Sequence, residues 1–570
     1  MDQSNLQGSR DATIVSVGES WAAGVSPIPV SPRSKRMRWG VAGAVVIAVV
    51  VATAAGAFAL SGAAGSKSLT ASLAPKNSVA FLEVRTDLPG DQHTKLADFM
   101  SHFPGFKDRA QFDNALDELL NKLTSEVSPD LRYSSAFKPW LEGEVSIAVT
   151  GVGSVAPMMM SSDAAYKLPG AVAIFALKDR AAAEAWVTSE LSRNAIKTES
   201  AAYAGTTLYT TGSGVNQGAY ALTDQDLLLG TVDGVKAALD TKTNGSLADN
   251  ANYQAAMKSL SGDNIARFYV AAGSYMQSMM GPEASWAPSL GMAAQSLPAW
   301  VAGSVRAESD RMVVDVAMPQ TTNSGNGNHT SRLASALPGN TVGVYEMHSI
   351  GSVVTKALDT LTAQSGATAD AVKSVKDALT RIGGIDWLGD GTAVVTKDGA
   401  NYGGGVVVEA GDAATASAKA ATINNLVVLA GGSLKLTSRN ETYKGIDITV
   451  IGIPGGDGKP IEVAVAAKDN LLLAGYTDAF VKAVIDTTPA TSLAASPDYS
   501  AVMSAAGANN MSSVYVNIPA LEDQIGQALL ASQPSRWTLD YKPYFDHLGS
   551  VGYSMVDGNT VILRLVVMAK

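Results

Sequence analysis

The sequence predicts an α+β protein: a single N-terminal transmembrane helix followed by two tandem homologous α+β repeats with mostly antiparallel sheets. Three observations lead to this prediction. A long uncharged apolar run follows a basic cluster near the N-terminus, and short motifs recur in the same order in two halves of the chain. Within each half, short strand-like runs joined by hairpin turns alternate with stretches of helical periodicity.

The predicted transmembrane helix extends over residues 39–60, which include no charged residue. A helix of this length can cross about 30 Å of hydrocarbon. The predicted span includes Trp39, Val45, Val51 and Leu60. The basic residues that precede it are Arg33, Lys35, Arg36 and Arg38. Only Lys67 follows closely behind. This asymmetry predicts a single-pass protein of the cell membrane with a cytoplasmic N-terminus and extracytoplasmic C-terminal domains.

The segments that flank this helix are predicted to have no fold of their own. Residues 1–38 are rich in Ser, Gly and Pro, and they are expected to form a disordered cytoplasmic tail. Residues 61–74 are expected to be a linker. A cleaved signal peptide is the alternative interpretation of the apolar run, because Ala57-Phe-Ala59 resembles a cleavage site, although signal h-regions are usually shorter.

Composition limits the kinds of partner. Of the 570 residues, 46% are apolar and 16% are charged, and the formal net charge is −10. Residues 1–38 carry +2, so the remainder carries −12, which argues against nucleic acid as a partner. The chain has no cysteine, and none of its five histidines lies three or four residues from another. We therefore predict no cofactor and no metal site.

The repeats are predicted at residues 75–320 and 332–570, with an inter-repeat linker at 321–331. The motif Ser-Leu-Ala-x₄-Tyr-x-Ala-x-Met occurs at 246–257 and again at 492–503, a spacing of 246 residues. The stretch from Pro75 to Glu83 is likewise echoed by the stretch from Pro338 to Glu346. Several echoes in one order indicate a duplication rather than chance.

Each repeat is expected to carry several helices gathered on one face of its sheet. In the first repeat we expect strands at 79–85, 145–150, 171–177, 208–211, 219–223, 227–230 and 266–271, and a terminal hairpin of 303–308 with 312–318. Expected helices are 94–103, 111–125, 180–194, 233–240 and 252–260. The second repeat should end on a hairpin of 550–555 with 560–568.

One stretch resembles a known family. The segment Glu83-Val-Arg-Thr-Asp-Leu-Pro-Gly-Asp-Gln92, followed by Phe103-Pro-Gly-Phe106 and preceded by a basic-flanked anchor, is similar to the actinobacterial membrane-anchored proteins called domain of unknown function 3352. The resemblance implies a location and an architecture. It implies no catalytic residue, because the family has no established activity.

Several motifs suggest chemistry but have a simpler structural explanation. Gly212–Gly218 has the glycines of a phosphate loop, yet a strand follows it, so a hairpin turn is favoured. Asp386–Asp390 lacks the alternating acidic residues of a calcium loop. Glu83 and Glu346 occupy matching strand positions and could act as an acid/base pair only if both faced one cleft. We therefore name no catalytic residue.

Two methionine groups are candidates for an apolar groove or contact: Met158, Met159 and Met160 in one loop, and Met276, Met279 and Met280 in a helical region. Ordinary core packing is the alternative for both. The predicted function is a non-enzymatic envelope module that binds an envelope protein or an apolar ligand. The alternative is a carboxylate-dependent hydrolase of cell-envelope glycans, which would need two carboxylates about 5–10 Å apart in an open cleft.

Overall fold

The computed structural model describes residues 68–88, 90–151, 170–212, 217–260, 262–275, 297–320, 327–362, 373, 376–377, 384–455, 460–530, 535 and 537–570. The predicted transmembrane helix at 39–60 lies outside these residues, so that prediction stays untested. Among the helices of the described residues, none combines the length and the apolar character needed to cross a membrane.

Twenty strands form one sheet, ten from each half of the chain. The first half contributes β1 (Ala80–Arg85), β2 (Leu141–Val149), β3 (Ala171–Leu177), β4 (Thr198–Tyr203), β5 (Thr206–Thr211), β6 (Gly218–Leu222), β7 (Asp226–Thr231), β8 (Ala266–Val270), β9 (Val301–Glu308) and β10 (Arg311–Pro319). The second contributes β12 (Thr341–Met347), β13 (Leu388–Asp398), β14 (Asn401–Ala410), β15 (Thr437–Tyr443), β16 (Ile446–Ile453), β17 (Ile461–Lys468), β18 (Leu471–Gly475), β20 (Ser512–Asn517), β21 (Leu548–Val556) and β22 (Thr560–Ala569). A separate two-stranded ribbon pairs β11 (His329–Thr330) with β19 (Asn509–Asn510).

Helices pack against the sheet in both halves. The first half carries α2 (Gln92–Met100), α3 (Phe112–Val127), α4 (Tyr133–Ala136), α6 (Arg180–Arg193), α7 (Val232–Leu239), α8 (Thr241–Asn244) and α9 (Ala251–Ser259). The second carries α12 (Ile350–Thr362), α14 (Ala413–Leu434), α15 (Asp478–Asp486), α16 (Pro497–Ala506), α17 (Ile518–Leu530) and α19 (Lys542–Phe545). This mixture of helices with a large antiparallel sheet confirms the predicted α+β class.

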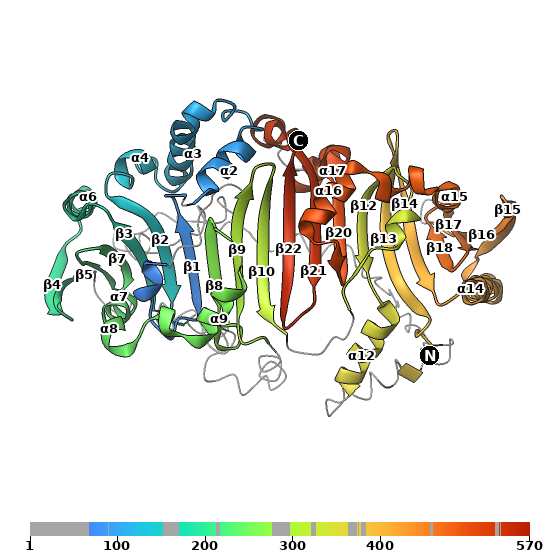
Figure 1. The fold of residues 1–570 in the computed structure, drawn as a ribbon, viewed down its shortest axis with the longest axis horizontal. Coiled ribbons are helices and arrows are strands. Elements are labelled where there is room, and N and C mark those ends of the chain that lie inside the picture. The colour runs from blue at the N-terminus through green and yellow to red at the C-terminus, as the bar shows by residue number, and fades with distance from the viewer. Residues whose placement is uncertain are drawn as a thin grey trace, which may run out of the picture.

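The ten strands of each half follow the same order when each half is followed from its outer edge to the centre of the sheet. It runs β4-β5-β6-β7-β3-β2-β1-β8-β9-β10-β22-β21-β20-β12-β13-β14-β18-β17-β16-β15, and every pairing in it is antiparallel (Figure 1). The second half therefore repeats the strand order of the first half in reverse across the sheet. Where the sequence predicts a sheet in each repeat, the structure has a single shared one.

The two halves meet at β10 and β22. Their antiparallel register extends from Arg311 opposite Met568 to Pro319 opposite Thr560. Within this register Val313 faces Val566, and both side chains are buried. Backbone hydrogen bonds along the pair make the two halves one continuous sheet.

A buried carboxylate reinforces this junction. Asp315 on β10 accepts a hydrogen bond from Arg306 Nη1 at 2.6 Å within the first half. It also accepts from Arg564 on β22, at 2.7 Å from Nε and 3.2 Å from Nη2. Asp315 is only 3% exposed and is the acceptor that the two guanidinium groups share, although Arg306 also lies 3.6 Å from Glu308.

Helices cover both faces of the sheet, so the expectation that they gather on one face is wrong. Strand β3 shows why, since all seven of its residues are buried. Val172 and Ile174 pack in a cluster with Val235 of α7, whereas the alternate residues of β3 pack in another cluster with Val187 of α6. A strand covered on both faces has an almost continuous apolar sequence, and β3 reads Ala-Val-Ala-Ile-Phe-Ala-Leu.

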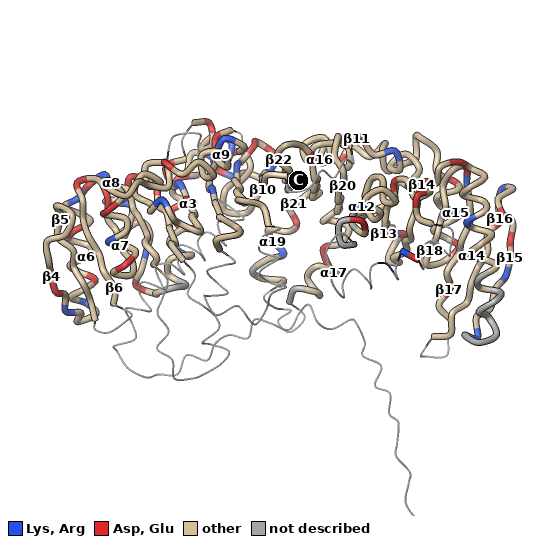
Figure 2. Tube along the Cα trace, turned by 90° about the horizontal axis from the view of Figure 1, so that it is seen from below, with Lys and Arg blue, Asp and Glu red and all other residues tan. Residues whose placement is uncertain are grey.

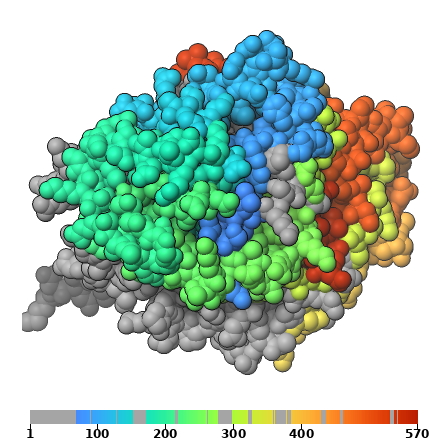
Figure 3. Space-filling model, turned by 60° about the vertical axis from the view of Figure 1, so that its left-hand side comes forward, coloured from blue at the N-terminus to red at the C-terminus, as the bar shows by residue number. Residues whose placement is uncertain are grey.

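The whole body is bent into an arch with β4 and β15 at its two ends (Figure 2). Helices α9 and α16 lie on the outer side of the arch, and α12, α17 and α19 lie on its inner side (Figure 2). In Figure 3 the first half comes forward, and its segments from β1 to α9 pack into one continuous body.

We expect Asp315→Asn to lower the free energy of unfolding by about 2–4 kcal/mol, because it removes the buried charged acceptor that Arg306 and Arg564 share. Urea denaturation followed by circular dichroism measures this change. Asp310→Asn is the matched control, since Asp310 is half-exposed and pairs only with neighbouring Arg311. A loss in the control equal to the loss in Asp315→Asn would contradict the bridging role.

Candidate functional site

Two kinds of feature stand out in the described residues: buried charged clusters on the outer side of the sheet, and an apolar surface on its inner side. The charged clusters occupy corresponding places in the two halves. Glu83 on β1 faces Arg267 across the β1–β8 pair, and Glu346 on β12 faces Ser513 across the β12–β20 pair. Both glutamates are 1% exposed.

In the first half, arginines neutralise the buried carboxylates. Arg267 Nη2 lies 2.5 Å from Glu83 Oε1, and Arg85 Nη1 lies 3.4 Å from Glu144 Oε2. Burial raises the pKa of Glu83, and the charge of Arg267 opposes that rise. The arrangement satisfies the rule that buried charges are paired.

Glu144 also fastens the start of the described chain to the sheet. Its carboxylate accepts hydrogen bonds from Ser68 Oγ at 2.9 Å, Leu69 N at 3.1 Å, Thr70 N at 2.8 Å and Thr70 Oγ1 at 2.6 Å. These residues lie within the predicted linker, 61–74, so the later part of that segment is bound to the sheet. The start of the described chain is therefore held by one charged acceptor on β2.

In the second half, histidines stand where arginine would be expected. His348 follows Glu346 by two residues, as Arg85 follows Glu83, and its Nε2 lies 3.3 Å from Glu346 Oε1. His329, from β11, stacks on His348 with ring centroids 3.8 Å apart and an interplanar angle of 16°. His329 Nε2 lies 3.3 Å from Asp390 Oδ1 on β13.

The other contacts of this cluster, which we call the histidine cluster (His329, His348, Glu346 and Asp390), go to backbone. Asp390 Oδ1 accepts from Ser349 N at 3.0 Å, while Asp390 Oδ2 and Glu346 Oε2 are buried without a hydrogen-bond partner. Burial alone would lower the pKa of His348, but the hydrogen bond to Glu346 and the charges of Glu346 and Asp390 outweigh it and raise that pKa.

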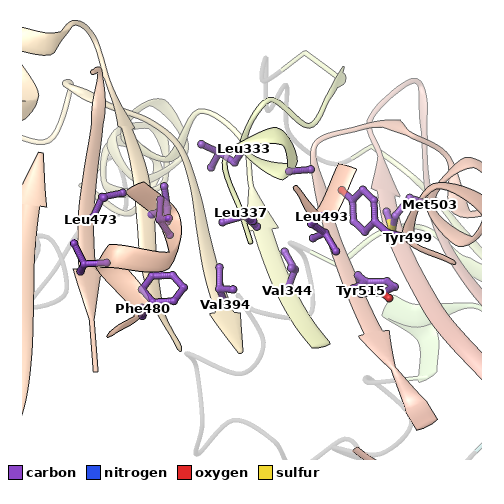
Figure 4. Packing of buried hydrophobic residues seen from close by; sticks show 14 of the residues in the cluster. Leu333, Leu337, Val344, Val394, Leu473, Phe480, Leu493, Tyr499, Met503 and Tyr515 are labelled. Atoms are coloured by element: carbon purple, nitrogen blue, oxygen red, sulfur yellow. The ribbon is translucent and has the colours of Figure 1, made fainter. Parts of the chain in front are cut away.

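Aromatic packing encloses the outer side of this cluster. Tyr499 on α16 lies edge-on to Tyr515 on β20, with ring centroids 5.2 Å apart (Figure 4). The first half has the same arrangement in Tyr253 and Tyr269, at 5.5 Å. The glutamates therefore lie beneath a helix and an aromatic pair, not in an open cleft.

The inner side of the second half presents an apolar surface. One residue from each of six adjacent strands forms a cross-strand row, which we call the inner row: Val406, Ala393, Tyr345, Val514, Tyr553 and Leu565. Val406, Tyr345 and Leu565 are 44%, 45% and 36% exposed. Their neighbours along the strands point to the other face, where Val344, Val394, Val407, Tyr515 and Val566 belong to the core.

Two helices bound the inner row. At one end of β13, Ile350 of α12 lies against Gly391. At the other end, the carbonyl oxygen of Ala520 in α17 accepts from Lys397 Nζ at 2.7 Å and from Tyr402 Oη at 3.1 Å. The row thus lies between α12 and α17, on the inner side of the arch (Figure 2).

Most residues that the sequence singled out lie outside the described residues. These are the anchor positions Trp39, Val45, Val51 and Leu60, the basic residues Arg33, Lys35, Arg36 and Arg38, and Met158, Met159, Met160, Met276, Met279 and Met280. Their predicted roles stay untested.

Glu83 and Glu346 do not share a cleft. Six strands lie between β1 and β12, so roughly 34 Å of sheet separates the two glutamates at about 4.8 Å per strand. They do not form the close acidic pair that the hydrolase alternative requires.

Sequence reasoning missed the histidine cluster. His329 and His348 are 19 residues apart, so the helical spacing test could not find them. A usable signal was present in the spacing of Glu346 and His348, because residues two apart on a strand face the same side.

Comparison with known proteins gives one strong match. The family model described as protein of unknown function (DUF3352) matches residues 41–436 and 432–542, which confirms the predicted family, while its actinobacterial and membrane-anchored character stays a prediction. No curated protein matches the chain. A crystal structure of RctB domains 2–3 aligns at 11% identity over 47% of this chain and 91% of that chain, but its TM-score of 0.07 carries no information about the fold.

We expect Glu144→Gln to lower the free energy of unfolding by about 2–4 kcal/mol, because four donors and Arg85 lose a charged acceptor. Chemical denaturation gives the value, and limited proteolysis should cleave earlier near Ser68–Thr70. Glu142→Gln, at an exposed position on the same strand, is the control. If Glu144→Gln unfolds at the same denaturant concentration as the parent protein, Glu144 does not fasten this segment.

Proposed function

The chain belongs to the DUF3352 family of proteins of unknown function, and we propose that it is a membrane-anchored extracytoplasmic binding protein that holds an apolar ligand on the inner row. The observation that carries this proposal is the exposed apolar character of the inner row between α12 and α17. Exposed apolar residues in isolation are ordinary, but a contiguous row on one sheet face is typical of a binding surface.

The contrast between the two faces of the same strands supports this proposal. Val344, Val394 and Val407 lie next to inner-row residues in sequence and are buried in the core on the outer side. The inner row has the same apolar composition but retains much of its exposure. Covering it with an apolar ligand would remove that surface from water, which is favourable by about 25 cal/mol per Å².

We infer that the ligand is a single lipid acyl chain. The inner row crosses six strands, so it is about 24 Å long at about 4.8 Å per strand. One acyl chain extends through half of a hydrocarbon core of about 30 Å, or about 15 Å, and therefore fits along the row. The predicted anchor at 39–60 would keep this surface beside a membrane, where such chains are available.

The duplication is part of the proposal. The motif echoes at a spacing of 246 residues and the mirrored strand order both support two copies of one α+β unit. The first half carries the arginine-neutralised glutamate, and the second carries the inner row and the histidine cluster. We propose that the first copy is mainly structural and that the second holds the ligand.

We expect the purified full-length protein to bind a fluorescent sixteen-carbon fatty acid in a titration, and Tyr345→Asp to weaken binding about tenfold. The variant places a charge in the middle of the row, where desolvation costs at least about 1.4 kcal/mol. Native mass spectrometry should also detect lipid that is retained through purification.

Ile461→Asp is the matched control, because Ile461 on β17 is 45% exposed, as Tyr345 is, and lies outside the inner row. The control should bind like the parent protein. Absence of binding by the parent protein, or an equal loss in the control, would contradict the proposal.

A further inference from the structure

We propose that His329, His348 and Asp390 form a binding site for a divalent transition metal of the zinc class, with the carboxylate of Glu346 beside the ion. This inference is independent of the proposed lipid ligand. One ligand atom from each of the three residues lies within 4.8 Å of the others. Imidazole nitrogen and carboxylate oxygen are ligands that zinc commonly takes in proteins.

The hydrogen bonds of the two imidazoles leave the correct nitrogens free. His348 Nδ1 lies 2.8 Å from the carbonyl oxygen of Asn510, and His329 Nδ1 lies 3.1 Å from the carbonyl oxygen of Thr330. A carbonyl oxygen can only accept, so each Nδ1 carries the proton. In the neutral ring each Nε2 offers a lone pair, which is the usual state of a metal-ligating histidine, and on His348 the ion would take the place of the proton that is hydrogen-bonded to Glu346.

The spacing around these nitrogens suits metal ligands better than ion pairs. Each Nε2 lies 3.3 Å from a buried carboxylate oxygen, His348 from Glu346 and His329 from Asp390. Charge-assisted hydrogen bonds are usually 2.7–2.9 Å long. Two ligands at about 2.0–2.1 Å from a tetrahedral zinc ion are separated by about 3.3 Å, which is the separation of His329 Nε2 and Asp390 Oδ1, and all three ligand atoms lie within 4.8 Å of one another. Because the two imidazole rings are stacked, one ring must turn for both Nε2 atoms to point at one ion.

A comparison of the charged residues around the buried carboxylates of the two halves also favours a metal ion in the second half. In the first half, Arg267 pairs with Glu83, and Arg85 pairs with Asp87 at 2.6 Å and with Glu144 at 3.4 Å. In the second half, the corresponding carboxylates are Glu346 and Asp390, but Ser513 stands at the Arg267 position and His348 at the Arg85 position. The second half therefore lacks both arginines, and a divalent cation would supply positive charge in their place.

Protonation of the histidines does not restore this balance. The rings are stacked at 3.8 Å, and two imidazolium ions so close together would repel each other. Asp390 Oδ2 is also buried without a partner, as is Glu346 Oε2, whose counterpart Glu83 Oε2 in the first half is unpartnered too. An unpartnered buried charge is expensive, and coordination by a metal ion removes that cost.

Such a site would join distant parts of the chain. His329 lies on β11, which pairs with β19 in a ribbon separate from the main sheet, whereas Asp390 lies on β13. A bound ion would therefore hold the segment between the two halves against the second half.

The test uses the purified full-length protein after removal of metals with EDTA. Isothermal titration with zinc chloride should show one site per chain, and zinc should raise the melting temperature. We expect His329→Gln to weaken zinc binding by at least tenfold, and His93→Gln, at an exposed histidine outside the cluster, to leave it unchanged. No zinc binding by the parent protein, or equal binding by His329→Gln, would overturn the proposal.

A second variant distinguishes the loss of a metal site from misfolding as the cause of weaker zinc binding. Ser513→Arg places in the second half the arginine that neutralises Glu83 in the first. We expect it to raise the melting temperature of the metal-free protein and to weaken zinc binding. A stable Ser513→Arg protein that binds zinc as the parent does would contradict the charge-balance argument.

Discussion

The pairing of β10 with β22 is the interaction on which the rest of the structure depends. It turns two ten-stranded halves into one sheet, and it leaves β4 and β15 as the edges of that sheet. Both edges are polar, reading Thr-Glu-Ser-Ala-Ala-Tyr and Thr-Ser-Arg-Asn-Glu-Thr-Tyr. Charged and polar edge strands discourage further strand addition, so growth of the sheet ends at these two edges.

The two halves share a strand order but surround their buried glutamate with different side chains. Glu83 and Glu346 lie at corresponding positions beneath a helix and a tyrosine pair, where a charge needs a partner. Arg267 supplies that partner in the first half. In the second half Ser513 cannot, and His329 enters from outside the main sheet to stack on His348. The difference between the halves is therefore chemical, although their strand order is the same.

Local patterns predicted the elements well. The strand expected at 171–177 is β3, and the terminal hairpins are β9–β10 and β21–β22. β4 was missed, because Thr198–Tyr203 is a mostly exposed edge strand with no apolar alternation. The shared sheet was also missed: the sequences of β10 and β22 indicate strands, but local periodicity does not state which strand is the neighbour. The histidine cluster depends on the same long-range pairing and was invisible for the same reason.

The account's central claim is that the two halves are one sheet through β10 and β22. Hydrogen–deuterium exchange of the full-length protein tests it most directly, since backbone amides in a sheet interior open only with large-scale unfolding. The structure predicts that amides of 311–319 and 560–569 exchange as slowly as those of β1 and β12. Rapid exchange of both segments, with β1 and β12 still protected, would show that the halves are separate bodies and would contradict this account.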